Sequence, residues 1–326
     1  MRKFIDPSKK QPLEEDSEGN LTLRGENTAS VYRSHEGCYD FAIAGEECAA
    51  ERGFYDIQYA KKSVNEFLPE DLEREWFDDM APWRKTVLLS LGELAGKDVL
   101  LLGNGDTRRE FFFLQLGANV VFTDLSIEAV KHAKREFGTI GFDETLRGTA
   151  EFHAVDALKL PFPDGSFDVI YGAAFVHHLE AAELERFFLE VHRCLRPGGI
   201  SRFIDQAYSP IWRLMTESVF YPLKWWSYRR VPRSPADVRA DREGGFRKAR
   251  LSSLGDKCGF QRLLFHREWF FHRIATRHYG LFFNYSPAAI RRAKWLFRVT
   301  RWLDQRLAKS SFIERNGIML VWGFDK

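Results

Sequence analysis

Hydrophobic and polar positions change their pattern several times along this chain of 326 residues. Residues 1–30 are mostly polar or charged and show no apolar periodicity, so they predict a flexible arm. Apolar residues then recur at helical spacing across residues 31–95, most clearly in 49–64 and 82–97. This second part predicts a helical cap or lid that precedes the main domain.

A regular alternation of strands and helices runs from residue 96 to residue 205. Short apolar runs typical of buried strands occupy residues 98–102, 119–123, 150–155, 167–172 and 199–205. Strands that alternate with helices predict parallel pairing through right-handed crossovers. The segment 96–205 therefore predicts the core of a doubly wound α/β fold, and we expect it to bind the cofactor.

The last part of the chain, residues 206–326, loses this alternation. It opens with an aromatic and basic stretch, returns to a strand pattern at 260–270, and becomes basic and helical at about 286–309. An apolar run at 316–324 predicts a final strand. We therefore expect a mostly parallel, seven-stranded sheet with N-terminal helices and a helical, basic C-terminal insertion on the substrate side.

The net charge of +2 hides a strong asymmetry along the chain. Residues 1–200 carry a charge of about −13, and residues 201–326 carry about +15. Such a difference indicates either an acidic partner or a basic face that balances an acidic one within a single fold. The four cysteines are scattered without metal-ligand spacing, so we expect reduced thiols, no metal and a cytoplasmic location. No run of about 18 apolar residues occurs, so no membrane span is predicted.

A glycine turn links the first predicted strand of the sheet to its helix. Gly103 and Gly105 bring backbone N–H groups close to a ligand at the N-terminus of that helix. Arg108 occupies the place of the third glycine of a dinucleotide fingerprint, which argues against a nicotinamide dehydrogenase. Thr107 and Glu110 match a capping box, so this helix has its own N-terminal signal.

Four stretches of the chain together resemble the class I S-adenosylmethionine-dependent methyltransferases. They are VLLLGNGD, VVFTDLS, AVDALKLPFPDGSFDVIYGAAFVHHL and LRPGGISRFID, and they lie between residues 97 and 205. The resemblance implies a Rossmann-like methyltransferase fold with S-adenosylmethionine as the cofactor. It also implies an enzyme that transfers the methyl group to a small-molecule or lipid-like acceptor, most simply by O- or N-methylation. An acidic acceptor would suit the basic C-terminal part.

The resemblance assigns the first half of the cofactor site to the glycine turn and the next strand end. Gly103 and Gly105 would line the methionine part of the cofactor. Asp124, about 20 residues after the turn, would accept hydrogen bonds from the ribose hydroxyls, and Leu125 would pack on the adenine. From the residues alone, Asp124 could instead cap the following helix, a task for which Ser126 is equally suited.

The second half of the implied site comes from later strands and from the N-terminal helices. Asp156 would accept a hydrogen bond from the adenine amino group, with Ala157 beside it, and Ala173 would border the methyl group. In this family, helices before the first strand often close over the cofactor. Tyr55 or Tyr59 would then contact the sulfonium through a ring face, although an aromatic stripe also suits an ordinary core.

Two positions depart from the family pattern. Leu101 stands where the family has an acidic residue, and Thr107 replaces the third glycine. The missing acid normally helps to hold the amino-acid end of the cofactor, and Asp106 or Glu110 are the residues available to replace it. These departures support an alternative in which a degenerate methyltransferase fold serves as a non-catalytic binding or partner subunit.

Candidate catalytic residues follow the fourth and fifth strands of the predicted core. His177 and His178 come just after the fourth strand, and Asp205 and Tyr208 follow the fifth. All four lie at the carboxyl edge of the sheet, where ligands bind in such folds. A general base would help if the acceptor is a hydroxyl. Each of these residues could also be a hydrogen-bonded loop residue or a cap.

Tryptophan, tyrosine and basic residues gather in residues 211–233. Three interpretations fit this composition: an apolar pocket with a cationic rim, a helical subdomain that covers the sheet, or peripheral contact with an anionic membrane surface. No RNA-binding module is recognisable in the chain, so nucleic acid is not an expected partner.

Overall fold

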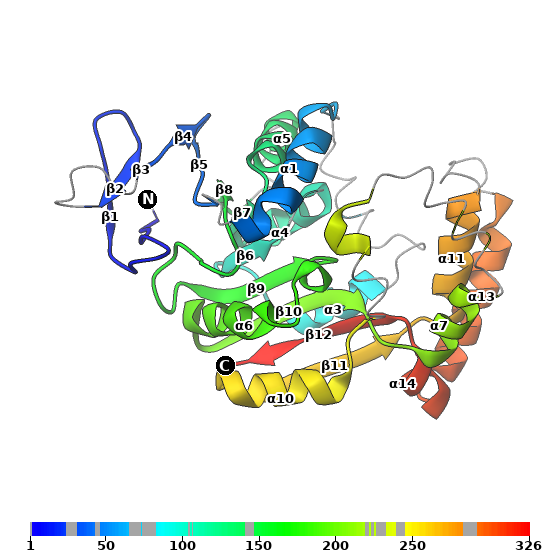
Figure 1. Ribbon diagram of the computed structural model, residues 1–326. Coiled ribbons are helices and arrows are strands. Elements are labelled where there is room, and N and C mark those ends of the chain that lie inside the picture. The colour runs from blue at the N-terminus through cyan, green and yellow to red at the C-terminus, as the bar shows by residue number, and fades with distance from the viewer. Residues whose placement is uncertain are drawn as a thin grey trace.

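Seven strands form one central sheet, in the order β11-β12-β10-β9-β6-β7-β8 (Figure 1). The computed structural model describes residues 2–23, 31–42, 46–64, 73, 83–103, 105, 107–140, 147–218, 222, 225, 233–238, 245–282 and 292–326. The strands are β6 (Asp98–Leu102), β7 (Asn119–Asp124), β8 (Ala150–Ala154), β9 (Phe167–Ala173), β10 (Leu195–Gln206), β11 (Arg262–Glu268) and β12 (Met319–Asp325). Strand β12 pairs antiparallel with both of its neighbours, whereas β10, β9, β6, β7 and β8 pair in parallel. The predicted seven-stranded, mostly parallel sheet is confirmed.

Helices cover both faces of this sheet, as a doubly wound fold requires. They are α3 (Trp83–Leu91), η1 (Thr107–Phe111), α4 (Phe112–Gln115), α5 (Ile127–Thr139), α6 (Glu183–Cys194) and α10 (Lys248–Cys258). The sheet separates two apolar cores, one on each face. In strand β6, Leu100 and Leu102 belong to one core, and Val99 and Leu101 belong to the other. Helices α6 and α10 pack on the first core, and α3, α4 and α5 pack on the second. Successive strand residues point to opposite faces, so a strand buried on both faces is apolar throughout.

The N-terminal residues differ from the prediction of a flexible arm. Strands β1 (Leu13–Glu15), β2 (Leu21–Leu23) and β3 (Val31–Tyr32) form a small antiparallel sheet, and β4 (Ser34–His35) pairs with β5 (Cys38–Tyr39). Phe4 and Leu21 are buried in the core on the α6 side, and Tyr32 donates a hydrogen bond to Asp6. Phe41 then donates its backbone N–H to Ala154 at the edge of β8. Phe4 packs on Phe41 and on Phe162, which lie 37 and 158 residues further along the chain, so no local pattern reveals its burial.

Helix α1 (Glu46–Ala60) is the described part of the predicted N-terminal cap, together with α3. It packs beside α5, and Figure 1 shows the two helices next to each other. Ser126 at the start of α5 donates a hydrogen bond of 2.5 Å to Asp56 of α1, which fixes α1 over the carboxyl end of β7. The short strands at 31–39 were not predicted, because each contains only two residues.

The C-terminal insertion is helical, as predicted. Helices α7 (Pro210–Glu217), α11 (Phe271–Phe282), α13 (Lys294–Leu307) and α14 (Ser311–Asn316) lie together at one end of the molecule, away from the N-terminus (Figure 1). The buried carboxylate of Asp304 accepts the backbone N–H groups of Phe270, Phe271 and His272 at the start of α11, which joins α13 to α11. Among the described residues, no helix is long and apolar enough to cross a bilayer.

Candidate functional site

A cavity of about 580 Å³ lies at the carboxyl ends of β6, β7, β8 and β9. The strand order reverses between β6 and β9, and ligands of open α/β sheets bind at such a reversal. The volume falls within the range of about 300–1,000 Å³ that is typical of small-molecule sites. The cavity wall brings together every residue that the sequence assigned to the cofactor: Tyr59, Gly103, Gly105, Asp124, Leu125, Asp156, Ala157 and Ala173.

Both glycines of the turn are required by close neighbours. Gly103 has a φ of +64°, and a Cβ atom at this position would lie 2.4 Å from the ring of Phe175. A Cβ at Gly105 would lie 2.4 Å from the hydroxyl oxygen of Tyr59. The turn therefore leaves room for a tyrosine from α1 and a phenylalanine from the segment after β9, and both of them line the cavity.

Asp124 ends β7 and faces the cavity. Its Oδ1 accepts the backbone N–H of Ser126 at 2.9 Å, and Ser126 itself caps α5 by accepting from Ala129. The cap of α5 is therefore Ser126, which removes the alternative role that the sequence left open for Asp124. Burial raises the pKa of the Asp124 carboxyl from 3.8 to about 6. A buried carboxylate with a raised pKa is typical of a functional site.

Asp156 supplies a second carboxylate across the same cavity. It follows β8, and its Oδ1 accepts the backbone N–H of Leu158 at 2.8 Å, which orders the loop that carries Ala157. Leu125 and Leu158 add apolar surface to the cavity wall. The cavity thus has a carboxylate at each of two neighbouring strand ends, with apolar side chains nearby.

The position of the missing family acid is filled by an apolar side chain. Leu101 is fully buried in the core on the α5 side. Glu110, one of the two residues that the sequence offered as a replacement, is buried and lines the cavity beside Arg109. Asp106 and the side chain of Thr107 lie outside the described residues, so the predicted capping box remains a prediction.

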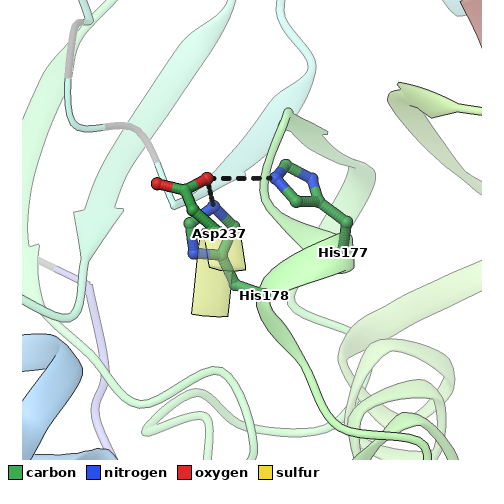
Figure 2. A group of neighbouring side chains, drawn as sticks. All are labelled: His177, His178 and Asp237. Atoms are coloured by element: carbon green, nitrogen blue, oxygen red, sulfur yellow. Dashed lines mark ion pairs between the residues drawn. The ribbon is translucent and has the colours of Figure 1, made fainter. Parts of the chain in front are cut away.

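His177 and His178 occupy η2 (Val176–His178), directly after β9, and each ring is held by a carboxylate. His177 Nδ1 lies 2.8 Å from Asp205 Oδ1, and His178 Nδ1 lies 2.8 Å from Glu51 Oε1. Both rings direct Nε2 toward the same oxygen, Asp237 Oδ1, at 3.9 Å and 3.7 Å respectively (Figure 2). Of the two histidines, His178 lines the cavity.

Asp205 lies within β10, three per cent exposed, rather than after the strand. Its second oxygen accepts the indole N–H of Trp322 at 3.2 Å, so both oxygens face protein groups. Asp205 therefore positions His177 and does not face the cavity as a predicted catalytic carboxylate would. Tyr208 stacks under the guanidinium of Arg247, 3.7 Å from its ring centre.

Carboxylates determine the charge of the cluster around His177 and His178. Burial disfavours the charged form of His177, but the Asp205 and Asp237 carboxylates outweigh it and raise its pKa to about 9. The same interaction with His177 lowers the pKa of Asp237 to about 2. Burial opposes ionisation of Glu51, yet its hydrogen bond to His178 lowers its pKa below the usual value. The cluster therefore combines negative carboxylates with a positively charged imidazole at neutral pH.

Sequence reasoning missed Glu51 and Asp237. Glu51 precedes Tyr55 by one helical turn on α1, so the predicted lid face offered a weak signal for it. Asp237 lies in the described segment 233–238, about 60 residues after the histidines, and no spacing connects them. The sequence left a pocket, a helical subdomain and a membrane contact open for 211–233, and Trp212 of this segment is buried against Phe270, Ile313 and Ile318. Much of 211–233 lies outside the described residues.

Comparisons with known proteins identify the domain in which most of this site lies. Residues 100–203 match the family described as methyltransferase domain. An uncharacterized methyltransferase of Synechocystis sp. is 33% identical over 110 residues, which cover 34% of this chain and 47% of the relative. Demethylmenaquinone methyltransferase of Renibacterium salmoninarum is 27% identical over 160 residues, which cover 43% of this chain and 62% of the relative.

A phosphoethanolamine N-methyltransferase 2 of Haemonchus contortus, solved in complex with S-adenosyl-L-methionine, matches 87% of this chain and 60% of its own at 14% identity and a TM-score of 0.47. The chain thus spans less than two thirds of the length of each relative named here. The match to residues 100–203 and the strand order of the sheet together support a class I S-adenosylmethionine-dependent methyltransferase.

Proposed function

We propose that this protein transfers the methyl group of S-adenosylmethionine to an oxygen or nitrogen atom of a small-molecule or lipid-like acceptor. One observation carries the proposal: the cavity joins a pair of carboxylates at two strand ends to a histidine held by a third carboxylate. When bound, S-adenosylmethionine supplies an activated methyl group on a sulfonium. The protein then needs only to align the acceptor with it and to remove the acceptor's proton.

The residues of the cavity fit this cofactor. Asp124 lines the cavity and accepts the backbone N–H of Ser126 through Oδ1, and we assign its carboxylate to the ribose hydroxyls. We assign Asp156 to the adenine amino group and Glu110 to the amino-acid end. Tyr59, held over Gly105, would close the methionine side of the site and exclude water there.

The acceptor would enter opposite the adenosine part, next to His178. We propose that the His177–His178 pair activates the acceptor, with Glu51 and Asp205 as the residues that position the two rings. Demethylmenaquinone, in the name of one relative, is a small molecule, which supports an acceptor of that size.

Calorimetry followed by a transfer assay tests the proposal. We expect the purified chain to bind S-adenosylmethionine and to form S-adenosylhomocysteine with quinol, phenol or amine acceptors. His178→Gln should keep cofactor affinity within about threefold and lower turnover about 100-fold or more, in the range of general acid–base contributions. His266→Gln, on the exposed edge of β11, is the matched control and should change neither. If the cofactor does not bind, the alternative of a non-catalytic subunit is favoured.

We also propose peripheral contact with an anionic membrane, made by α13 rather than by Trp212. Trp295, Val299 and Trp302 follow one another at helical spacing and are 67%, 48% and 54% exposed. Arg298 and Arg306 are exposed beside them, and Arg306 lies over the Trp302 ring. A helix face of this composition suits the interface between lipid headgroups and acyl chains.

Sedimentation with vesicles tests this contact. The protein should pellet with phosphatidylcholine vesicles that contain phosphatidylglycerol, and less so at high salt, because screening weakens surface charges. The double variant Trp295→Glu, Trp302→Glu should remain in solution. Leu89→Glu, at a 74% exposed position of α3, is the control and should pellet like the wild type. Equal pelleting of the double variant and the wild type would contradict the proposal.

A further inference from the structure

We propose that His177, His178 and Asp237 form a binding site for a divalent transition-metal ion at the rim of the cavity. One atom from each residue, namely the two Nε2 atoms and Asp237 Oδ1, lies within 4.8 Å of the others. Figure 2 shows the two rings and the carboxylate turned toward a common point. The sequence predicted no metal, because Asp237 is separated from the histidines by about 60 residues.

The three ligand atoms are spaced more like the ligands of one ion than like hydrogen-bonded pairs. Asp237 Oδ1 lies 3.7 Å and 3.9 Å from the two Nε2 atoms, which is beyond hydrogen-bond length. Two ligands of a tetrahedral ion with metal–ligand bonds of about 2.1 Å are about 3.4 Å apart. The two distances from Asp237 would therefore have to shorten by about 0.3–0.5 Å. The two Nε2 atoms lie within 4.8 Å of each other, so their separation would have to shorten by at most about 1.4 Å.

The residues behind the histidines match the environment of a metal site. A metal-bound histidine usually donates its other ring N–H to a carboxylate, which fixes the tautomer and the direction of the ring. Here Asp205 holds Nδ1 of His177 and Glu51 holds Nδ1 of His178, both at 2.8 Å. Asp205 is itself fixed by Trp322, so one of the two rings is supported from the centre of the sheet.

The charge and the donor types indicate which kind of ion would bind. Glu51, Asp205 and Asp237 place three carboxylates around two imidazoles, so a doubly charged cation would offset much of the negative charge. Two imidazole nitrogens and one carboxylate oxygen suit zinc, iron(II) or cobalt(II) better than calcium or magnesium. Three protein ligands leave a coordination position open for a water or a substrate oxygen.

This inference rests on the proposed function and describes how the histidine pair would activate an acceptor. His178 and Ala236, the neighbour of Asp237, both line the cavity, so the open position would face the acceptor. A metal ion lowers the pKa of a bound hydroxyl, which then loses its proton to water. The oxygen forms its bond to the methyl carbon as the carbon–sulfur bond breaks, and no oxidant or reductant is needed.

Titration of the metal-free full-length protein with Co²⁺ tests the site without any methyl transfer. We expect one equivalent to bind, with visible absorption bands typical of low coordination, and Zn²⁺ should displace it. Asp237→Asn and His177→Gln should each weaken binding at least tenfold, and Asp205→Asn should weaken it about 10- to 100-fold through the ring that it positions. His266→Gln is again the control. Circular dichroism checks that every variant is folded.

The opposing arrangement is an ion pair of His177 with the Asp205 and Asp237 carboxylates, with no metal bound. It predicts that the wild type binds Co²⁺ no more tightly than Asp237→Asn does, and that result would overturn the proposal. Calorimetry with S-adenosylmethionine on the same samples keeps the two proposals apart. If the wild type binds S-adenosylmethionine normally but does not bind Co²⁺, only the metal site is refuted. If the wild type does not bind S-adenosylmethionine, the proposed function is refuted.

Discussion

Replacement of Asp124 by asparagine should weaken cofactor binding and at the same time stabilise the folded protein. Asparagine has the same shape, and its oxygen can still accept the N–H of Ser126. Its other atom is an NH₂ donor, so it cannot accept a hydrogen bond from a ribose hydroxyl. The loss of one charge-assisted hydrogen bond costs about 1.5–3 kcal/mol, which corresponds to about 10- to 150-fold in affinity.

The same variant should be more stable than the wild type, because burial disfavours the charged carboxylate of Asp124 in the folded protein. Burial raises its pKa from 3.8 to about 6 in the folded state. The folded protein therefore binds this proton more tightly than the unfolded chain does, and the resulting stability is present below pH 4 and is lost as the pH rises through 6. At 1.36 kcal/mol per pKa unit the loss is at most about 3 kcal/mol, and contact with solvent in the cavity makes it smaller. Asp124→Asn avoids this loss.

Calorimetry with S-adenosylmethionine and urea unfolding between pH 4 and pH 8 measure both effects. The variant should be more stable than the wild type at pH 7.5, and the difference should vanish near pH 4. Wild-type affinity for the cofactor should fall below pH 6, whereas the weak binding of the variant should not. Asp164→Asn is the control, because this carboxylate is 80% exposed and, within the described part of the chain, pairs with Arg193 at the surface. Unchanged affinity in Asp124→Asn would refute the assignment of the ribose site.

Three further predictions concern the turn, the histidine support and the sheet. Gly105→Ala should weaken cofactor binding at least tenfold in calorimetry, since its Cβ would displace Tyr59. The control is Gly138→Ala, in an open stretch of α5, which should stabilise the fold by about 0.5–1 kcal/mol. Asp205→Asn should lower turnover at least tenfold and leave cofactor affinity within threefold, because Asp205 acts through His177; an equal loss of affinity would show a merely structural role. Gly323→Ala should cost about 3 kcal/mol or more in urea unfolding, because its Cβ would lie 1.9 Å from the carbonyl oxygen of Ser201 on β10; a wild-type midpoint would contradict the strand pairing.

The amino-acid sequence by itself determined the sheet and the cofactor side of the cavity. Buried strands and amphipathic helices leave local periodic patterns, so the alternation over residues 96–205 was enough to predict a doubly wound fold. Gly103, Asp124 and Asp156 stand at strand ends, and the carboxyl ends of parallel strands meet at one edge. Their convergence therefore followed from strand order alone.

Only the tertiary structure decided what surrounds His177 and His178. Glu51 comes from a helix before the sheet and Asp237 from a segment after it, and no repeat or spacing links them to the histidines. The burial of Phe4 and Leu21 has the same origin, because each finds apolar partners far along the chain. Local patterns record which way a side chain points within its own helix or strand. Contacts between segments distant in sequence depend on how those elements pack, which leaves no periodic trace in the sequence.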